Sequence, residues 1–544
     1  MNRNKNLQRL KTENFDICII GGGASGAGVA LDAALRGYKV ALVEASDFAS
    51  ETSSKSTKLI HGGVRYLEQA FMNFDFAQLK QVRHGLEERH ILLSNAPHLA
   101  RALPLVTPVF SWFEGFYFTI GLTIYSWFAK NDPLPSSKWL SRKDTFARMS
   151  TLKKRTHSSV LYYDGQLDDA RYCLAIIQSA DAAGAAVVNH ASVTDFEKNT
   201  ENKITAAIVK DNVTGDFFPV KSKLFINCTG AFSDNIRLTA NKNLEKRIRP
   251  SKGAHVILPF EVLNSDSAML IPKTHDGRVV FAIPFEGKVM VGTTDTDCDN
   301  TQNEPVLQHT EINFLIETLE RYLEKPIPRD SIQAGFAGLR PLIAASASKS
   351  TKKLVRDHEV EVDTQSGLIS LLGGKWTTYR LMAQDTVDVV DEILKEKIGN
   401  CTTEKHILFG GDSAGAGFIQ SSAKKFNLPE TIIKHLFSKY GSQTNKVLAL
   451  TQENSEWSQP LTPASTILKA EVIYATREEM AMTVRDFLAR RTRLEITDWQ
   501  AASQSARPVA QLMGETLDWS NEKIEKEIAN YETLIHSFVD SSIR

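Results

Sequence analysis

Two short apolar runs on either side of a glycine-rich helical stretch form the first informative part of the chain. Residues 17–20 read Ile-Cys-Ile-Ile, residues 24–36 are rich in alanine, glycine and leucine, and residues 39–43 form a second, mostly apolar run. Short apolar runs bounded by glycine indicate buried strands. The pattern predicts a strand, a glycine turn, a helix and a second buried strand.

The turn after the first strand carries the spacing G-x-G-x-x-G, filled by Gly21, Gly23 and Gly26. In a dinucleotide site the first glycine permits a tight turn, the second lets the backbone approach a pyrophosphate, and the third lets the helix pack on the strand. The helix N-terminus, with Ala24 and Ser25 in its first turn, would supply amide donors to the phosphates. We therefore expect a dinucleotide site here.

Glu44 ends the second strand, 18 residues after Gly26. A carboxylate near this spacing typically holds the hydroxyl groups of a ribose. Because a carboxylate disfavours the 2′-phosphate of NADP, the expected cofactor is NAD or FAD.

Later features favour FAD over NAD. After Glu44 the chain enters a loop rich in small and hydroxyl side chains, instead of the next alternating unit of an NAD domain. A later apolar strand ends at Gly230, and a third strand is followed by Gly373 and Gly374. Three returns to one glycine-lined site fit a cofactor held along its whole length, as a flavin would be. The polar residues of the loop that are expected at the site are Thr52, Ser53, Ser54, His61, Arg65 and Tyr66.

Five segments of the chain resemble the FAD-dependent glycerol-3-phosphate dehydrogenases. They read ETSSKSTKLIHGGVRYLE, GTTDTD, AGLRPL, GGKWTTYR and REEMAMTVRDFLARRTRL. The resemblance spans nearly the whole chain. It implies that the protein binds FAD, oxidises sn-glycerol 3-phosphate to dihydroxyacetone phosphate, and passes the electrons to a membrane quinone.

The resemblance also implies a mixed α/β (α+β) fold. A glutathione-reductase-type FAD-binding domain would be interleaved with an antiparallel-sheet substrate domain, and a C-terminal helical cap would follow. We expect the oxidoreductase body to span residues 1–397 and the cap to span 398–544. Within the body, the expected FAD-binding segments are 14–75, 150–250 and 335–397, and the expected substrate segments are 76–149 and 250–335.

The substrate would be a phosphomonoester with about two negative charges near neutral pH, so its pocket should hold several cations, preferably arginines. Four cationic residues lie in the blocks that resemble the family's substrate-binding segments, and Tyr66 adjoins one of them. Arg340 lies between apolar neighbours, which favours a partly buried and paired side chain. The expected cations are Arg65, Arg340, Arg356 and Lys375.

Oxidation of the substrate also needs a group that takes the proton of its C2 hydroxyl. His61 and His255 are the two candidates, and the sequence leaves open which of them acts. The start of the helix from Gly374, with Thr377 and Thr378, would contact the flavin ring and stabilise negative charge on it.

Composition and charge exclude several classes of binding partner and metal site. Of the 544 residues, 64 are Lys or Arg and 64 are Asp or Glu, so the formal net charge is zero and nucleic acid is not an expected partner. The five cysteines lie at least 55 positions apart, which excludes Cys-x-x-Cys sites and favours the reducing cytoplasm. No metal site is expected, since the calcium-like loop from Asp295 has Asn300 and Val306 at positions that require Gly and Glu.

Residues 102–129 are aromatic and apolar, with Glu114 as their only charge. Pro104 and Pro108 interrupt the start of this segment, and the remaining apolar run is too short to cross a membrane. Residues 138–157 add seven Lys or Arg against one Asp. The pair of segments predicts peripheral attachment to an anionic membrane surface, on its cytoplasmic face. The alternative is a buried helix pair packed against the cap.

Residues 469–498 form a long amphipathic run, expected to be a helix that packs in the core or between two copies of a homodimer. Within this run, Glu478, Glu479, Arg490 and Arg491 are expected to form a salt-bridged helix surface.

Two other functions stay open. One is a glycerol-3-phosphate oxidase that passes electrons to oxygen and makes hydrogen peroxide. The other is a non-enzymatic FAD-binding protein that associates with membranes. The cations and His61 argue against the second, because a pure FAD binder needs no cation cluster beyond its cofactor.

Overall fold

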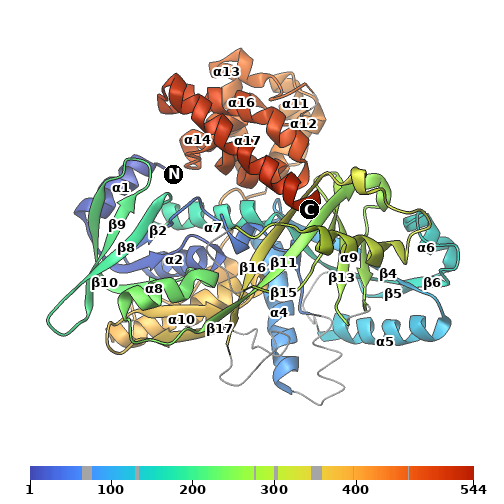
Figure 1. The fold of residues 1–544 in the computed structure, drawn as a ribbon, viewed down its shortest axis with the longest axis horizontal. Helices are drawn as coiled ribbons and strands as arrows, with labels where there is room; N and C mark the ends of the chain where they lie inside the picture. The colour runs from blue at the N-terminus through green and yellow to red at the C-terminus, as the bar shows by residue number, and fades with distance from the viewer. Residues whose placement is uncertain are drawn as a thin grey trace.

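The computed structural model describes residues 1–63, 76–128, 134–274, 277–298, 304–344, 358–395, 397–413, 415–463 and 465–543. Two sheet-containing halves of the oxidoreductase body lie side by side, and a helical domain sits across the top of both (Figure 1). The long helix α4 (Phe76–Asn95) runs between the two halves.

The first sheet is parallel at its centre. Its main path runs β17-β18-β10-β1-β2-β7, and β9 and β8 extend antiparallel from β10. β1 is flanked by β10 and β2, and both pairs are parallel. The strands are β1 (Asn14–Ile20), β2 (Val40–Val43), β7 (Ala186–Val188), β8 (Ala191–Lys198), β9 (Ile204–Asp211), β10 (Phe217–Asn227), β17 (His358–Val362) and β18 (Ile369–Gly373).

Successive residues of β1 face opposite sides of this sheet, as strand geometry requires. Ile17 and Ile19 pack in the core that contains helices α2 (Ala24–Arg36), α7 (Asp169–Ala182) and α10 (Tyr379–Leu394). Cys18 and Ile20 pack on the other side, against β8, β9, α1 (Arg3–Thr12) and α8 (Ser233–Ala240). The predicted strand, turn, helix and strand are all present.

The second sheet is mostly antiparallel. Its main path runs β15-β11-β14-β13-β12-β4-β6-β3, with β16 paired to β11 and β5 paired to β6. The strands are β3 (Leu59–Ile60), β4 (Ala100–Val109), β5 (Lys138–Leu140), β6 (Ser158–Leu167), β11 (Ile248–Pro259), β12 (Ala268–Ile271), β13 (Val280–Phe285), β14 (Lys288–Gly292), β15 (Thr296–Asp297) and β16 (Ala334–Ile343). β3, β6 and β16 thus join this sheet from within segments that were expected to bind FAD.

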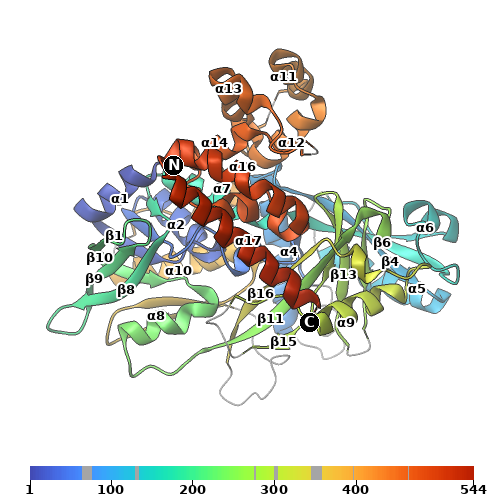
Figure 2. The same ribbon diagram turned by 45° about the horizontal axis from the view of Figure 1, so that its top comes forward.

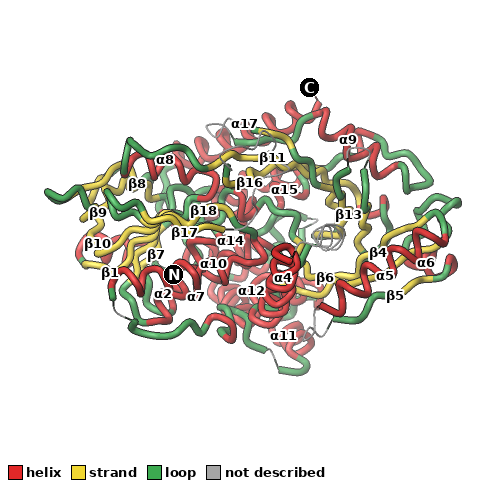
Figure 3. Tube along the Cα trace, turned by 90° about the horizontal axis from the view of Figure 1, so that it is seen from below, coloured by secondary structure: helices red, strands yellow, loops and turns green. Residues whose placement is uncertain are grey.

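The predicted aromatic segment divides into the strand β4 and the helix α5 (Trp112–Phe128). Pro104 and Pro108 lie in the strand. α5 packs on β4, β5 and β6, at the lower right of Figure 1 and away from the cap. Figure 3 shows α5 and α6 (Arg142–Arg148) together at one end of the molecule, with α9 (His309–Glu320) along another side. Among the described helices, none has the length and apolarity that a membrane crossing requires.

The C-terminal domain is a bundle of helices. Figure 2 shows its last helix, α17, lying across the top of the body towards α9. Its α-helices are α11 (Phe418–Phe426), α12 (Glu430–Tyr440), α13 (Thr444–Glu453), α14 (Lys469–Glu478), α15 (Leu494–Thr497), α16 (Trp499–Leu517) and α17 (Asn521–Ile543).

The expectation of one long helix over residues 469–498 was wrong. The run divides into α14, a helical turn at Asp486–Arg491 and α15. Asp486 accepts hydrogen bonds from the amides of Met482, at 2.8 Å, and Thr483, at 3.0 Å, and its own amide donates to the Thr483 hydroxyl at 3.2 Å. Thr483 and Asp486 thus form a reciprocal capping box at the start of a new helical turn.

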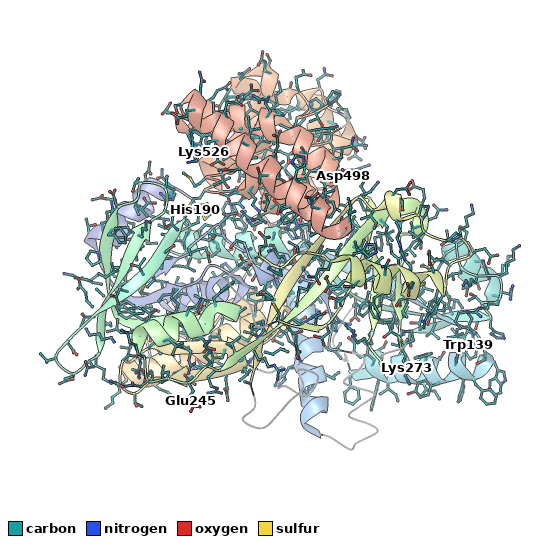
Figure 4. All side chains as sticks on the ribbon, viewed as in Figure 1. Trp139, His190, Glu245, Lys273, Asp498 and Lys526 are labelled. Carbon is teal, nitrogen blue, oxygen red and sulfur yellow. The ribbon has the colours of Figure 1, made fainter. Side chains whose placement is uncertain are left out.

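Of the four residues that were expected to form a solvated, salt-bridged surface, Glu478 is exposed and the other three are not. Glu479, Arg490 and Arg491 are buried where the C-terminal domain meets the body. Arg490 and Arg491 both bind Asp47, which lies just after β2. In Figure 4, His190 and Asp498 mark the two sides of this contact zone between the domain and the body. Buried ion pairs between the C-terminal domain and the body therefore fix the position of the domain.

Candidate active site

One cavity of about 760 Å³ is lined by residues from both sheets. The glycine turn after β1 and the end of β2 lie at it, as do parts of β11 and β16 from the second sheet. Its volume is within the range of about 300 to 1,000 Å³ that is usual for sites of small molecules and cofactors.

The glycine turn contacts the cavity at the N-terminus of α2. Gly21 has φ of +109°, and a Cβ there would lie 2.8 Å from the carbonyl oxygen of Cys228. A Cβ on Gly26 would lie 1.9 Å from the carbonyl oxygen of Gly21. The tight turn and the close approach of helix and strand therefore both require glycine.

Glu44 is at the end of β2, as predicted, and it lines the cavity. Its carboxylate accepts hydrogen bonds from the amides of Gly22, at 2.6 Å, and Ser46, at 2.8 Å. Burial raises the pKa of Glu44, although these two amides oppose the shift. The carboxylate is thus fixed in orientation beside the glycine turn.

The hydroxyl-rich loop joins the two halves of the site. Ser53 accepts a hydrogen bond from the Ala24 amide at 2.9 Å, and its own carbonyl accepts one from the Trp376 indole at 2.9 Å. Thr52 donates to the carbonyl of Leu339 on β16 at 2.6 Å. The loop is therefore bound to α2, to the segment after β18 and to the second sheet.

Most of the predicted cofactor residues line the cavity. Gly26 does not, because it packs α2 on the strand, and Ser54 and Thr378 turn their hydroxyls to the backbone carbonyls of Glu51 and Lys375. Those that do line it are Gly21, Gly23, Ala24, Ser25, Glu44, Thr52, Ser53, Gly230, Gly374 and Thr377.

Arg340 and Lys375 reach the same cavity from the body's second sheet and from the segment after β18. Arg340 is half-buried and paired, as the sequence indicated. It donates to the Thr293 hydroxyl and the Thr294 carbonyl, both at 3.0 Å, and lies 3.5 Å from the carboxylate of Asp295. A Cβ on Gly253 would lie 2.3 Å from the guanidinium, so this glycine makes room for the arginine.

His255 lines the cavity from β11 and is buried. Its ring stacks on Phe336 at 4.8 Å between centroids, and its Nε2 lies 3.0 Å from the Thr57 hydroxyl. Burial, together with the charges of Lys58 and Arg340, lowers the pKa of His255 well below its usual range. The imidazole is therefore neutral near pH 7.

His61 lines the cavity as well. Burial, with the charges of Lys375 and Arg89, lowers its pKa to about 4. The next residue, Gly62, donates its amide to the Tyr125 hydroxyl at 2.8 Å. The site thus holds two neutral imidazoles near two cations, which is an arrangement that can bind an anion and accept a proton.

Three predicted substrate residues, Arg65, Tyr66 and Arg356, lie outside the described residues. Two residues that sequence reasoning did not select belong to the site or support it. Thr57 lines the cavity beside His255, and Lys58 is buried against Asp169 at 3.0 Å. Both stand in the segment SSKSTKL, whose hydroxyl content was the available signal. The partners, at positions 255 and 169, come from distant parts of the chain.

The residues present fit FAD. A glycine turn at a helix N-terminus faces the cavity, an oriented carboxylate lies beside it, and hydroxyl groups continue from there toward the histidines and cations.

Comparisons with known proteins agree with this geometry. Residues 16–380 match the FAD dependent oxidoreductase family, and residues 401–524 match the C-terminal domain of alpha-glycerophosphate oxidase. A probable mitochondrial glycerol-3-phosphate dehydrogenase of Dictyostelium discoideum is 37% identical over 98% of this chain and 86% of its own length. The mitochondrial glycerol-3-phosphate dehydrogenase of Homo sapiens is 37% identical over 96% of this chain and 73% of its own.

A solved structure of glycerol-3-phosphate dehydrogenase from Bacillus halodurans, complexed with FAD, has a TM-score of 0.80 and 28% identity and covers 99% of this chain and 97% of its own. The predicted mixed α/β fold with an FAD-binding domain and a helical C-terminal domain is confirmed, and so is FAD as cofactor. The chain belongs to the FAD-dependent glycerol-3-phosphate dehydrogenase family.

Proposed function

We propose that this protein oxidises sn-glycerol 3-phosphate to dihydroxyacetone phosphate and passes the electrons to a quinone in a membrane on which it docks. The observation that carries the first part is the cavity itself. Neutral His61 and His255 and the cationic Arg340 and Lys375 line the same cavity as the glycine turn of the FAD site. The names of the relatives at 37% identity support the same substrate.

Each residue has a defined task in this proposal. Arg340 and Lys375 bind the phosphate and hydroxyl oxygens of the substrate through charge-assisted hydrogen bonds. A neutral histidine takes the proton of the C2 hydroxyl, and His255, held by Thr57 and stacked on Phe336, is the more rigidly positioned of the two. Bound FAD supplies the acceptor for the hydride that leaves C2.

The reductive step is tested without air. The purified protein is mixed anaerobically with sn-glycerol 3-phosphate, and the visible flavin absorbance is followed; sn-glycerol 1-phosphate, the mirror image, is the control. The proposal expects the first compound to bleach the flavin and the second to leave it oxidised. A yellow protein that neither compound bleaches would contradict the assigned substrate.

The acceptor half of the proposal rests on α5. Its outer face exposes Trp112, Phe113, Phe116, Tyr117, Ile120 and Trp127, each between 45% and 68%. Beside it, Lys138, Arg142, Lys143, Arg148, Lys154 and Arg155 are exposed. Aromatic rings at headgroup depth next to a basic surface suit an anionic bilayer, and a lipid-soluble quinone would be reached from there. We place this attachment at the cytoplasmic face.

The inner face of α5 is fixed to the body. Tyr125 is buried, and its hydroxyl donates to Asp164 at 3.0 Å. With a rise of about 1.5 Å per residue, 17 residues span roughly 25 Å, less than the hydrocarbon core. The helix therefore suits a position along the surface of a bilayer.

Membrane docking is tested by sedimentation with vesicles. Wild-type protein should sediment with vesicles that contain anionic phospholipid and remain in the supernatant with purely zwitterionic ones. The double variant Phe113→Ser with Phe116→Ser should lose most of this binding, whereas Phe217→Ser, which removes a similarly exposed ring from β10, should retain it. If both variants bound the vesicles equally, α5 would not be the docking surface.

Oxygen is the second candidate acceptor, because the C-terminal match is to a domain of alpha-glycerophosphate oxidase. Hydrogen peroxide per turnover distinguishes the two acceptors in air, with and without a soluble quinone. The quinone proposal expects little peroxide and a rate that rises with quinone. One peroxide for each substrate oxidised, at a rate that quinone does not change, would assign an oxidase.

A further inference from the structure

One arginine of the C-terminal domain reaches beneath the loop that lines the active site. Arg493 is fully buried and has φ of +72°, which is uncommon for a residue with a side chain. Its Nη2 donates to the carbonyl of Ser54 at 2.7 Å and to Oδ1 of Asp169 at 2.8 Å, and its Nη1 donates to the carbonyl of Ala489 at 3.0 Å. The guanidinium therefore joins the C-terminal domain to the FAD-binding body.

Asp169 holds the same loop with its other oxygen. Oδ2 accepts from the amide of Ser56 at 3.0 Å, from the Ser56 hydroxyl at 2.7 Å and from Nζ of Lys58 at 3.0 Å. Asp169 and Lys58 are both fully buried. One carboxylate, neutralised by Arg493 on one side and Lys58 on the other, thus fixes two residues of the loop.

The residue between those two is the one that contacts the candidate base. Thr57 stands between Ser56 and Lys58, lines the cavity, and lies 3.0 Å from Nε2 of His255. Arg493 and Asp169 do not line the cavity. Arg493 therefore does not touch the cavity itself, and its bonded route to the cavity is the loop that carries Thr57.

We propose that Arg493 is a positioning residue of the active site: it sets the backbone of residues 54–58, and through it the Thr57 hydroxyl against His255. This inference rests on the proposed function only for its kinetic consequence. Arginine suits the task because its planar guanidinium offers several N–H donors in fixed directions, whereas the compact ammonium of lysine can neutralise Asp169 without reproducing that geometry. The C-terminal domain then completes the catalytic centre of the body.

The test compares two conservative variants of the full-length chain. Arg493→Lys alters the proposed contact. Arg171→Lys is the matched control, because Arg171 is also buried between body and domain, 2.7 Å from Glu479, without a hydrogen bond to residues 54–58. Amide hydrogen exchange is measured over residues 52–58 in the FAD-free and FAD-bound proteins. We expect Arg493→Lys to raise exchange in this loop at least tenfold and Arg171→Lys to leave it near the wild-type value.

The kinetic readout is a double-mutant cycle on the anaerobic rate of flavin reduction. Arg493→Lys and Thr57→Val should each slow the step roughly five- to tenfold, and the combined variant should be no slower than the worse single one, because both act on one contact. Unchanged exchange in Arg493→Lys, or losses that multiply in the combined variant, would overturn the proposal.

A replacement variant and a measurement on the FAD-free protein keep the role of Arg493 testable. If the Arg493→Lys protein does not accumulate, Arg493→Gln takes its place: it leaves the bonds of Asp169 to Ser56 and Lys58 in place and shortens the side chain that reaches the Ser54 carbonyl, and the same rise in loop exchange is expected. Exchange that rises elsewhere but not at residues 52–58 would overturn the proposal for that variant too. Failure of glycerol 3-phosphate to reduce the wild-type flavin would refute the proposed function, whereas the exchange experiment on the FAD-free protein would still decide the role of Arg493.

Discussion

The hydroxyl of Thr57 lies 3.0 Å from Nε2 of His255, and these two residues are separated by 198 positions in the chain. One comes from the hydroxyl-rich loop of the FAD-binding body and the other from β11 of the second sheet. The contact fixes the ring of the candidate base between Thr57 and Phe336.

Replacing Thr57 by valine keeps the shape of the side chain and removes this hydrogen bond. A hydrogen bond of this kind contributes about 1 kcal/mol, so we expect flavin reduction to slow by roughly five- to tenfold with FAD retained. Stopped-flow absorbance under anaerobic conditions measures the rate. Thr57→Ser, which keeps the hydroxyl, is the control; a valine variant as fast as the serine variant would show that the contact does not matter for the reaction.

Arg340→Ala and Lys375→Ala each remove a cation from the cavity. We expect kcat/KM for glycerol 3-phosphate to fall at least tenfold in either variant, which corresponds to about 1.4 kcal/mol of transition-state binding. Steady-state kinetics with a soluble quinone provides the measurement. Arg507→Ala, which removes an exposed arginine 2.7 Å from Glu525, serves as control. Near wild-type values for Arg340→Ala or Lys375→Ala would show that the affected cation does not bind the substrate.

The pH dependence of the reaction can identify the base. Burial is the main reason that the pKa of His61 is lowered to about 4, and the charge of Lys375 adds to it. A base with a lowered pKa stays neutral, and so competent, down to that pH. If His61 is the base, Lys375→Met should raise the pKa and move the acid limb of the rate upward in pH.

The rate of flavin reduction between pH 4 and 7, at saturating substrate, checks this expectation, because the limb then reports the enzyme–substrate complex. Adding His61→Asn to Lys375→Met should abolish the limb together with most of the rate. A limb that stays in place in Lys375→Met would favour His255, whose lowered pKa is attributed to burial and to the charges of Lys58 and Arg340.

Gly26→Ala tests the packing of α2 on the glycine turn. The new Cβ would lie 1.9 Å from the carbonyl oxygen of Gly21, which is backbone and cannot move without the turn itself. We expect loss of bound FAD and a lower Tm, measured from the ratio of flavin to protein absorbance and by thermal unfolding. A Cβ on Gly121, in α5, would have no atom within 4 Å apart from the backbone of its own helix, so Gly121→Ala should keep its FAD and its Tm. Full FAD content in Gly26→Ala would refute the close approach of helix and strand.

The free energy of unfolding should fall as pH rises and His190 loses its proton. Burial opposes the charged form of this imidazole, but Asp486, 2.8 Å away, more than offsets burial, so the pKa is raised above 6.5. Asp47 and Arg490 are the other charged groups that act on it.

A raised histidine pKa gives stability that is complete below about pH 6.5 and is lost as pH rises through the folded-state value. The free energy of unfolding of the wild type should therefore decrease between pH 6 and pH 8.5 by more than that of His190→Gln. Denaturant titrations at the two pH values measure both. Parallel losses in the two proteins would assign the pH dependence to other groups.

The sequence predicted the parts of the site that depend on local spacing. The glycine turn, the carboxylate of Glu44 and the glycines after the later strands all follow from short-range rules about turns and helix ends. His255 and Arg340 were selected from a resemblance, and the structure brings both to the cavity. Their contacts with Thr57 and Thr293 could not be predicted, since each depends on the pairing of strands that are far apart in sequence.

The division of residues 469–498 was missed for a related reason. Its amphipathic spacing indicates a continuous helix, but Thr483 and Asp486 each accept a hydrogen bond from the other's amide and so cap a new helical turn there. Buried partners in the body, such as Asp47 for Arg491, stabilise the resulting shape. Tertiary contacts of this kind outweigh helix propensity.

The bond between Ser54 and Arg493 also bears on how the protein is made. Its two residues are 439 positions apart. At a synthesis rate of about 5 to 20 residues per second, roughly 20 to 90 seconds pass on the ribosome between them. Throughout that interval the nascent active-site loop lacks the guanidinium that bonds it in the folded protein, so this part of the catalytic centre is assembled only after the segment that carries Arg493 has been synthesised.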